Sequence, residues 1–269
     1  MRCSDEHVEG QGGIVVYKLN HKISKSRANF DFHLLRDNCI FEHRNITTKT
    51  NNMMRTLLFL LTTVIVATIP LTARAQDITL PEPVKKGGKP LMEALNDRQS
   101  AREFSTTDLS MQQLSNLLWA AWGINRPEAG KRTAPSSRNV QEIDVYVAIK
   151  SGLYIYDATA NKLKQVHNRD IRNFCGTQEF VATAPVNLMY VADMGKLGRK
   201  EGDVIRDADL FAPYANSGLI AQNVYLWCSS ENMACVIRAM IDRPTLAKEM
   251  NLRTNQAIIL GQSVGFNEK

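Results

Sequence analysis

Two arginines and a serine stand close together where a predicted helix ends in a loop. They are Arg98, Ser100 and Arg102, at alternate positions of the chain. An arginine presents a planar fork of hydrogen-bond donors, which suits phosphate oxygens and the electron-rich edge of a ring. The alternative is a solvated surface cluster with Asp97 and Glu103 as neighbours. Taken alone, the motif favours that surface cluster.

A polar loop that leads into a strand is the second candidate for ligand binding. It spans Thr133–Gln141, and the alternating segment Ile143–Ile149 follows it. Loops held at the mouth of a strand often bind ligands through backbone amides and short side chains. A solvated turn before an edge strand is the other interpretation.

Several kinds of chemistry find no support in this sequence. No G-x-G-x-x-G follows a predicted strand and no P-loop occurs, so a separate nucleotide-binding domain is not expected. There is no G-x-S-x-G elbow, and Cys175, Cys228 and Cys235 lack metal-ligand spacing. We therefore expect no metal, and we interpret the three thiols as small core residues. One continuous helix from Cys228 to Cys235 would separate them by about 10.5 Å, too far for a disulfide.

The periodicity of apolar residues predicts the elements that must position these groups. Helices are expected from Pro90 to about Asp97, from Met111 to Trp122 after a capping box at Ser110 and Gln113, over Ser217–Ser229 and over Pro244–Asn251. Strands are expected over 143–149, 153–156, 162–166, 186–192 and 257–264. Helices and strands are segregated more than alternated, which predicts an α+β fold with a largely antiparallel sheet flanked by helices.

The first 89 residues are not expected to belong to that fold. Residues 53–75 have a basic start, a short apolar run and the small-residue site Ala73-Arg74-Ala75, the pattern of a signal peptide. We expect cleavage there and a periplasmic or otherwise exported protein; an uncleaved membrane anchor is the alternative. Residues 1–52 are interpreted as an unfolded upstream extension, 76–89 as a linker and 90–269 as one domain.

Charge gives no argument for nucleic acid. The whole chain carries a net charge of +6. From Gln76 onward there are 23 lysines and arginines against 21 acidic residues, so the net charge there is near +2. The basic excess therefore lies mostly in the part that export would remove.

Taken in chain order, three motifs resemble the FMN-dependent nitroreductase family. They are Arg98–Phe104, Pro135–Gln141 and the helix Gly218–Ser229, and the chain closes on Val264-Gly265-Phe266. The resemblance covers about Leu91 to Phe266 and is to an exported, Bacteroides-type member. It implies a nitroreductase-like fold, a homodimer and FMN as cofactor.

The resemblance also implies roles for the matching residues. Arg98 would bind the FMN phosphate within a motif that includes Gln99, and Ser100 would bind the phosphate or the ribityl chain. Arg102 would lie near the N1/O2 edge of the isoalloxazine, where negative charge collects on reduction. The loop residues that would reach the flavin from the partner subunit are Pro135, Ser136, Ser137 and Asn139.

The C-terminal part of the chain would complete this site. The backbone of Ala239 and Met240 would lie near flavin N5, next to Ile237 and Arg238, and no side-chain catalyst is needed because the flavin does the chemistry. Lys269 would replace a terminal basic phosphate ligand.

Two departures from the family pattern affect the expected function. Gln178 stands near where the best-known members carry a polar and basic pair; it would donate to the pyrimidine edge and leave Arg102, with Arg238, to supply the positive charge. Met240 replaces a small residue. The resemblance implies hydride transfer between a small-molecule donor such as NAD(P)H and an acceptor such as a nitroaromatic or quinone. The alternative, supported by both departures, is a non-catalytic exported module that binds flavin or a related ligand.

Overall fold

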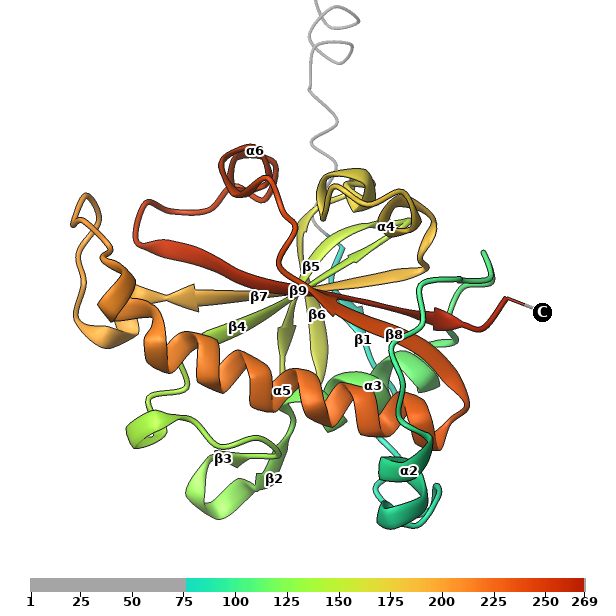
Figure 1. Ribbon diagram of the computed structural model, residues 1–269. Helices are drawn as coiled ribbons and strands as arrows, with labels where there is room; N and C mark the ends of the chain where they lie inside the picture. The colour runs from blue at the N-terminus through green and yellow to red at the C-terminus, as the bar shows by residue number, and fades with distance from the viewer. Residues whose placement is uncertain (1–75, 269) are drawn as a thin grey trace, which may run out of the picture. The chain divides into compact units, whose positions relative to one another are not determined.

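A seven-stranded sheet forms the centre of the computed structural model, which describes residues 76–268 (Figure 1). Its order is β1-β6-β5-β4-β7-β9-β8, and every neighbouring pair is antiparallel. The strands are β1 (Ile78–Thr79), β4 (Ile143–Ile149), β5 (Gly152–Asp157), β6 (Lys162–His167), β7 (Val186–Asp193), β8 (Met233–Arg238) and β9 (Gln256–Phe266). A separate two-stranded arm contains β2 (Ile124–Arg126) and β3 (Lys131–Arg132). The expected α+β class and antiparallel sheet are confirmed.

Helices cover both faces of the sheet (Figure 1). They are α2 (Leu91–Asp97), α3 (Met111–Trp122), α4 (Phe180–Thr183), α5 (Phe211–Ser230) and α6 (Arg243–Glu249). Apolar residues of α3 and α5 pack on one face, and those of α4 and α6 pack on the other. Strand β4 shows why: alternate side chains point to opposite faces, so Val145 and Val147 join the first core and Tyr146 and Ala148 the second.

Helix α3 forms where its local signals predict it. Ser110 accepts from the backbone N–H of Gln113 at 3.2 Å, and the Gln113 side chain accepts from the Ser110 N–H at 3.0 Å, so the capping box is present. Leu114, Leu117 and Leu118 are fully buried against the sheet. Burying each leucine contributes about 1.5–3 kcal/mol, so this face holds the helix in place.

Several elements differ from the sequence-based expectation. Strands β1, β2 and β3 were not predicted, and β1 pairs with β6 although it lies within residues 76–89, which were interpreted as a linker. Helix α5 begins at Phe211, six residues earlier than expected, and Pro213 is tolerated in its first turn because no intrahelical N–H is needed there. Strand β8 was not predicted, because a short apolar run cannot be assigned by period alone. Asn232, with a φ of 56°, makes the turn between them.

This turn places two of the three cysteines on different elements. Cys228 and Cys235 lie on a helix and a strand, so their separation along one helix has no meaning in the fold. Cys175, Cys228 and Cys235 are all buried thiols without a disulfide. Their interpretation as core residues is confirmed, although the stated reason was wrong.

Some expectations lie outside the described residues. These are the upstream extension 1–52, the signal peptide 53–75 and the proposed phosphate ligand Lys269. Within residues 76–268, no helix is long and apolar enough to cross a membrane.

Candidate functional site

The loop that carries the arginine–serine motif follows the edge of the sheet. The N–H of Ala101 donates to the carbonyl of Cys235 in the edge strand β8 at 3.0 Å, and the N–H of Ser105 donates to the carbonyl of Phe266 at 3.0 Å. Phe104 is buried between these two anchors. The loop is therefore fixed along β8 rather than left loose after α2.

A buried tyrosine joins this loop to the strand. The hydroxyl of Tyr225, on α5, lies 2.8 Å from the Ser100 hydroxyl and accepts from the Ile237 N–H at 3.0 Å. The Arg98 guanidinium lies over the same ring, 5.3 Å from its centre. One side chain thus joins the arginine–serine motif to Ile237, which the sequence analysis proposed separately.

The segment containing Gln178 lies beside the end of β8. The N–H of Thr177 donates to the carbonyl of Met240 at 3.2 Å. Two residues after Gln178, the Phe180 ring packs on Phe104 with 5.8 Å between ring centres. The segments 98–104, 176–180 and 237–240 therefore form one continuous surface around the edge strand.

Arg238 faces inward from this surface. Its side chain is buried and donates to Ser263 Oγ at 3.3 Å, to Asn187 Oδ1 at 2.6 Å and to the carbonyl of Cys175. Burial lowers its pKa to about 10, so it stays protonated at neutral pH. Among the described residues it forms no ion pair with a carboxylate. Its guanidinium is committed to neutral protein acceptors.

The two arginines of the 98–104 loop are more accessible than Arg238. Arg102 is exposed and Arg98 half-buried, and within residues 76–268 neither takes part in an ion pair. An anion approaching here would meet guanidinium donors that no carboxylate already occupies. These residues therefore fit a phosphate-bearing ligand.

The polar loop before β4 has an unusual backbone. Arg138, Asn139 and Gln141 have φ values of 54°, 55° and 56°, which non-glycine residues rarely adopt. The Gln141 N–H donates to Ser136 Oγ at 2.9 Å, and the Gln141 side chain donates to the carbonyl of Gly130 at 2.8 Å. A loop tied in so many places keeps one shape.

Two buried polar residues hold this loop from below. Asn216 Oδ1 accepts from the Ser137 N–H at 3.3 Å, and Asn216 Nδ2 donates to Glu142 Oε1 at 2.6 Å. Neither residue was singled out from the sequence, since Asn216 preceded the expected helix and Glu142 looked like an ordinary residue before a strand. Tyr225 was also missed, because an aromatic on an apolar helix face is usually core.

The two candidate regions lie at opposite ends of α5. Asn216 and Tyr225 are nine residues apart, which is about 13 Å of helix rise. Figure 1 shows the β2–β3 arm near one end of this helix and α2 near the other. One chain therefore does not bring the Pro135–Asn139 residues up to Arg98.

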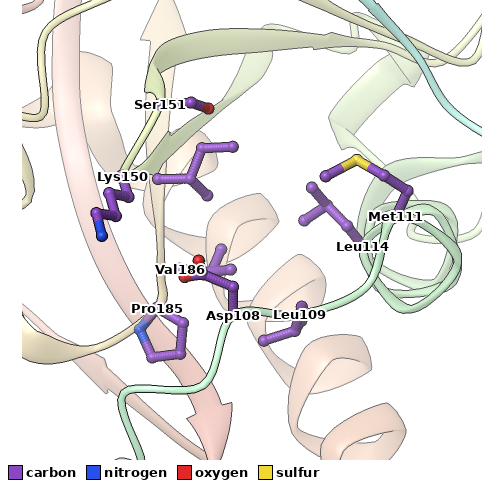
Figure 2. A pocket seen from close by; sticks show the side chains of 9 residues that line it. Asp108, Leu109, Met111, Leu114, Lys150, Ser151, Pro185 and Val186 are labelled. Carbon is purple, nitrogen blue, oxygen red and sulfur yellow. The ribbon is translucent and has the colours of Figure 1, made fainter.

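Cavities give little further guidance. A cavity of about 320 Å³ lies between the start of α3 and the β4–β5 turn, and its mostly apolar lining includes Asp108 and Lys150 (Figure 2). None of the proposed cofactor residues lines it. A smaller, polar cavity of about 210 Å³ is lined by Gln99, Ala101 and Tyr225, so it adjoins the arginine–serine motif. Because the polar cavity adjoins Arg98 and Ser100, we assign the candidate site to this cavity and the 98–104 loop.

Comparisons with known proteins agree on one family. Residues 95–266 match the Nitroreductase family. A crystal structure of a "putative nitroreductase" from Ralstonia eutropha is 40% identical, with a TM-score of 0.66, and the match covers 72% of this chain and 90% of that one. A "putative nitroreductase" of Methanocaldococcus jannaschii is 27% identical over 156 residues, or 54% of this chain and 76% of that protein.

A more distant structure supports the fold alone. A "putative nitroreductase" from Anabaena variabilis is 16% identical with a TM-score of 0.60, and the match covers 72% of this chain and 42% of that one. At this identity the likeness concerns the arrangement of helices and strands, not the site.

Proposed function

This chain belongs to the nitroreductase family, and from that premise we propose that it is an FMN-dependent oxidoreductase. The reaction would transfer two electrons, as hydride, between a donor such as NAD(P)H and an electron-poor acceptor such as a nitroaromatic or a quinone. When bound, FMN supplies this chemistry, and the protein supplies binding, orientation and electrostatics.

The arrangement around Tyr225 carries the proposal. Its hydroxyl fixes Ser100 against the backbone of Ile237, and Arg98 lies over its ring without a carboxylate partner among the described residues. A guanidinium and a hydroxyl beside a strand edge can bind a phosphate from one side. The Arg102 guanidinium, exposed four residues later, is then available for the electron-rich edge of a ring.

Further parts of the surface would complete the binding of FMN. The backbone of Ala239 and Met240 would approach N5, and Gln178 on the neighbouring segment would donate to the pyrimidine edge. Both segments are already joined through Thr177 and Met240. Arg238 would contribute its positive charge without contacting the flavin, because its guanidinium already donates to Ser263 and Asn187.

A homodimer would supply the remaining wall. In a single chain the outer face of α5 leaves Phe211, Tyr214 and Leu219 exposed, the last at 45%. A helix that is apolar on both sides needs a second packing partner. A twin subunit across this face would bring its Pro135–Asn139 loop to Arg98, which one chain does not do.

A second function has one specific observation in its favour. Met240 is 61% exposed at the segment proposed to approach N5. A flexible methionine there would narrow access for a donor or acceptor. A non-catalytic module that binds flavin without turnover is therefore the second candidate.

We also propose export, on the signal-peptide pattern of residues 53–75. Periplasmic protein is separated from the cytoplasmic NAD(P)H pool, so another reductant would then be the natural donor. Cell fractionation that finds the protein only in the cytoplasm would contradict this proposal.

One purification tests the enzyme proposal. The full chain is expressed, its absorption spectrum and sedimentation are recorded, and NAD(P)H is added without oxygen. We expect a yellow dimer that bleaches and regains colour with a quinone or nitro compound. Bound flavin that no donor reduces would favour the module. A colourless monomer that ignores added FMN would overturn both.

A further inference from the structure

The side chain of Asn216 connects the centre of the molecule to the polar loop. It is 3% exposed, and its two ends make different bonds: Oδ1 accepts from the Ser137 N–H, and Nδ2 donates to Glu142. A side-chain amide can turn over and exchange its oxygen and nitrogen. If this amide turned over, its nitrogen would face the Ser137 N–H and the loop would lose an acceptor.

Glu142 prevents that exchange. It is 1% exposed, and an ionised carboxylate only accepts hydrogen bonds, so it admits the nitrogen of Asn216 and not the oxygen. No cation pairs with it among residues 76–268, and its second oxygen, Oε2, has no hydrogen-bond partner there. A buried carboxylate without a cation is costly. Its visible effect is to orient one amide.

The loop needs such a restraint. Its three left-handed residues, Arg138, Asn139 and Gln141, each cost on the order of 1–3 kcal/mol of backbone strain. Strain of this size relaxes unless surrounding contacts oppose it. The bond from Ser137 to Asn216 is the contact that ties the strained stretch to α5.

We propose that Glu142 is a positioning residue: it orients Asn216, and Asn216 holds the 136–141 loop in the shape that a partner subunit's flavin accepts. This inference rests on the proposed function, because the loop meets FMN only across a dimer. Neither Glu142 nor Asn216 would contact the cofactor, and their role would be to fix the conformation of the loop that does.

Reversing the polarity of the pair tests the proposal. In Asn216→Asp two carboxylates face each other, while the acceptor for Ser137 is kept. The double variant Glu142→Gln/Asn216→Asp restores one donor and one acceptor with the same total charge. If Asn216→Asp does not fold, Asn216→Ala replaces it, because alanine removes both hydrogen bonds without adding charge.

Two measurements follow each variant. One is the dissociation constant for FMN, and the other is trypsin cleavage after Arg138, which is exposed in the strained stretch and reports the loop shape without cofactor. We expect Asn216→Asp to weaken FMN binding about tenfold or more and to open the Arg138 site, as for loss of a hydrogen bond to a charged group. The double variant should recover both within about threefold.

A matched control separates positioning from general stability. Asn161 also binds backbone through its side-chain amide, which donates to the carbonyl of Pro81 at 2.8 Å. It lies in the β5–β6 turn, near the β1 edge of the sheet and away from the β8 edge. Asn161→Asp should lower the melting temperature without changing FMN affinity. Equal FMN loss in this control would mean that stability alone explains the effect and would overturn the proposal.

The remaining outcomes are distinct. If the wild type binds FMN and Asn216→Asp binds it equally well, the positioning role is wrong while the proposed function stands. The role is also wrong if the double variant stays as weak as the single one. If the wild type binds no FMN, the proposed function fails and the flavin half of this inference fails with it.

Discussion

The two ends of α5 carry polar groups that are used in opposite ways. At the C-terminal end, Tyr225 satisfies the local backbone and hydroxyl groups, and Arg98 keeps its charge without a carboxylate partner among the described residues. At the N-terminal end, Asn216 bonds to Glu142 and to the backbone of the 136–141 loop, so both side chains stabilise that loop. One end leaves guanidinium donors without carboxylate partners among the described residues, and the other holds a loop in one conformation.

This difference teaches how the two halves of a site can be specified separately. A receiving surface, here formed by the segments 98–104, 176–180 and 237–240, needs guanidinium donors without carboxylate partners. A presenting loop, here residues 136–141, needs a rigid backbone. The helix between them keeps the halves about 13 Å apart in one chain, so the proposed function requires a half from each of two subunits.

Separating the two proposed subunits should have the largest effect, because each site would lose the loop that the partner presents. Leu219→Glu places a charge on the outer face of α5, where Leu219 is not part of the chain's own core. Burying that charge between subunits costs several kcal/mol, so we expect monomers without flavin but with an unchanged fold. Sedimentation, flavin content and circular dichroism measure this. Ala160→Glu, in the β5–β6 turn, should leave a flavin-bearing dimer.

Removing the receiving charge should have the next largest effect. Arg98→Ala should weaken FMN binding about 100-fold, as expected for loss of about 2–3 kcal/mol from a charge-assisted bond, and leave the dimer intact. Titration of the apoprotein by flavin fluorescence measures the change. Arg169→Ala removes a surface arginine that pairs with Glu249 and should have no effect. Equal flavin occupancy in both variants would contradict the phosphate assignment.

Loss of one hydroxyl should give a smaller effect at the same end. Tyr225→Phe leaves the Ile237 N–H and Ser100 without their partner. We expect the free energy of unfolding to fall by about 1–3 kcal/mol and FMN to bind about tenfold more weakly. Urea denaturation and flavin titration test this. In Tyr154→Phe, the lost hydroxyl contacts are with Ser151 and Gln165, so stability but not flavin affinity should change.

The smallest effect at neutral pH concerns a buried thiol below the receiving surface. Burial raises the pKa of Cys175 from 9.0 to about 12, so above pH 9 only the unfolded chain loses this proton. The free energy of unfolding should therefore fall as pH rises from about 9 towards 12, by about 1.4 kcal/mol per pH unit. Cys175→Ala should make that slope shallower in guanidinium denaturation series. An unchanged slope would show that the thiol does not cause it.

A second alkaline contribution should survive in that variant. Burial also raises the pKa of Tyr156 from 10.0 to about 12, so its stabilising effect is likewise lost as pH rises through that range. Tyr156→Phe in the Cys175→Ala background should flatten the curve further above about pH 10. Below about pH 9 neither group titrates in either state, so the flavin comparisons can be made there.

Much of the fold was predictable because its signals are local. The Ser110–Gln113 capping box fixes the start of α3, and the alternation of β4 follows from the pleat of a strand buried on both faces. Strand β8 escaped, because its six residues carry an apolar run without a distinguishing period. The early start of α5 escaped because Pro213 normally marks a helix boundary rather than a first turn.

The candidate site was predictable only in part. Arg98 and Ser100 stand in one short motif, and that motif lies on the receiving surface. Tyr225, Asn216 and Glu142 could not be selected, since their types and spacing match core or ordinary loop residues. Arg238 was chosen for its charge, but the fold turns its side chain toward Asn187 and Ser263.

Four features could be read from the sequence: the family, through the resemblance of three motifs, the α+β class, the antiparallel sheet and the Arg98–Phe104 motif. The helices and strands behind the fold class follow from spacing within a few residues, where a side chain's neighbours are set by the local backbone. Tertiary structure alone decided that Tyr225 meets Ser100 across 125 positions and that Asn216 meets Glu142 across 74. Such contacts depend on how an entire helix packs on a sheet, and no local pattern encodes that distance.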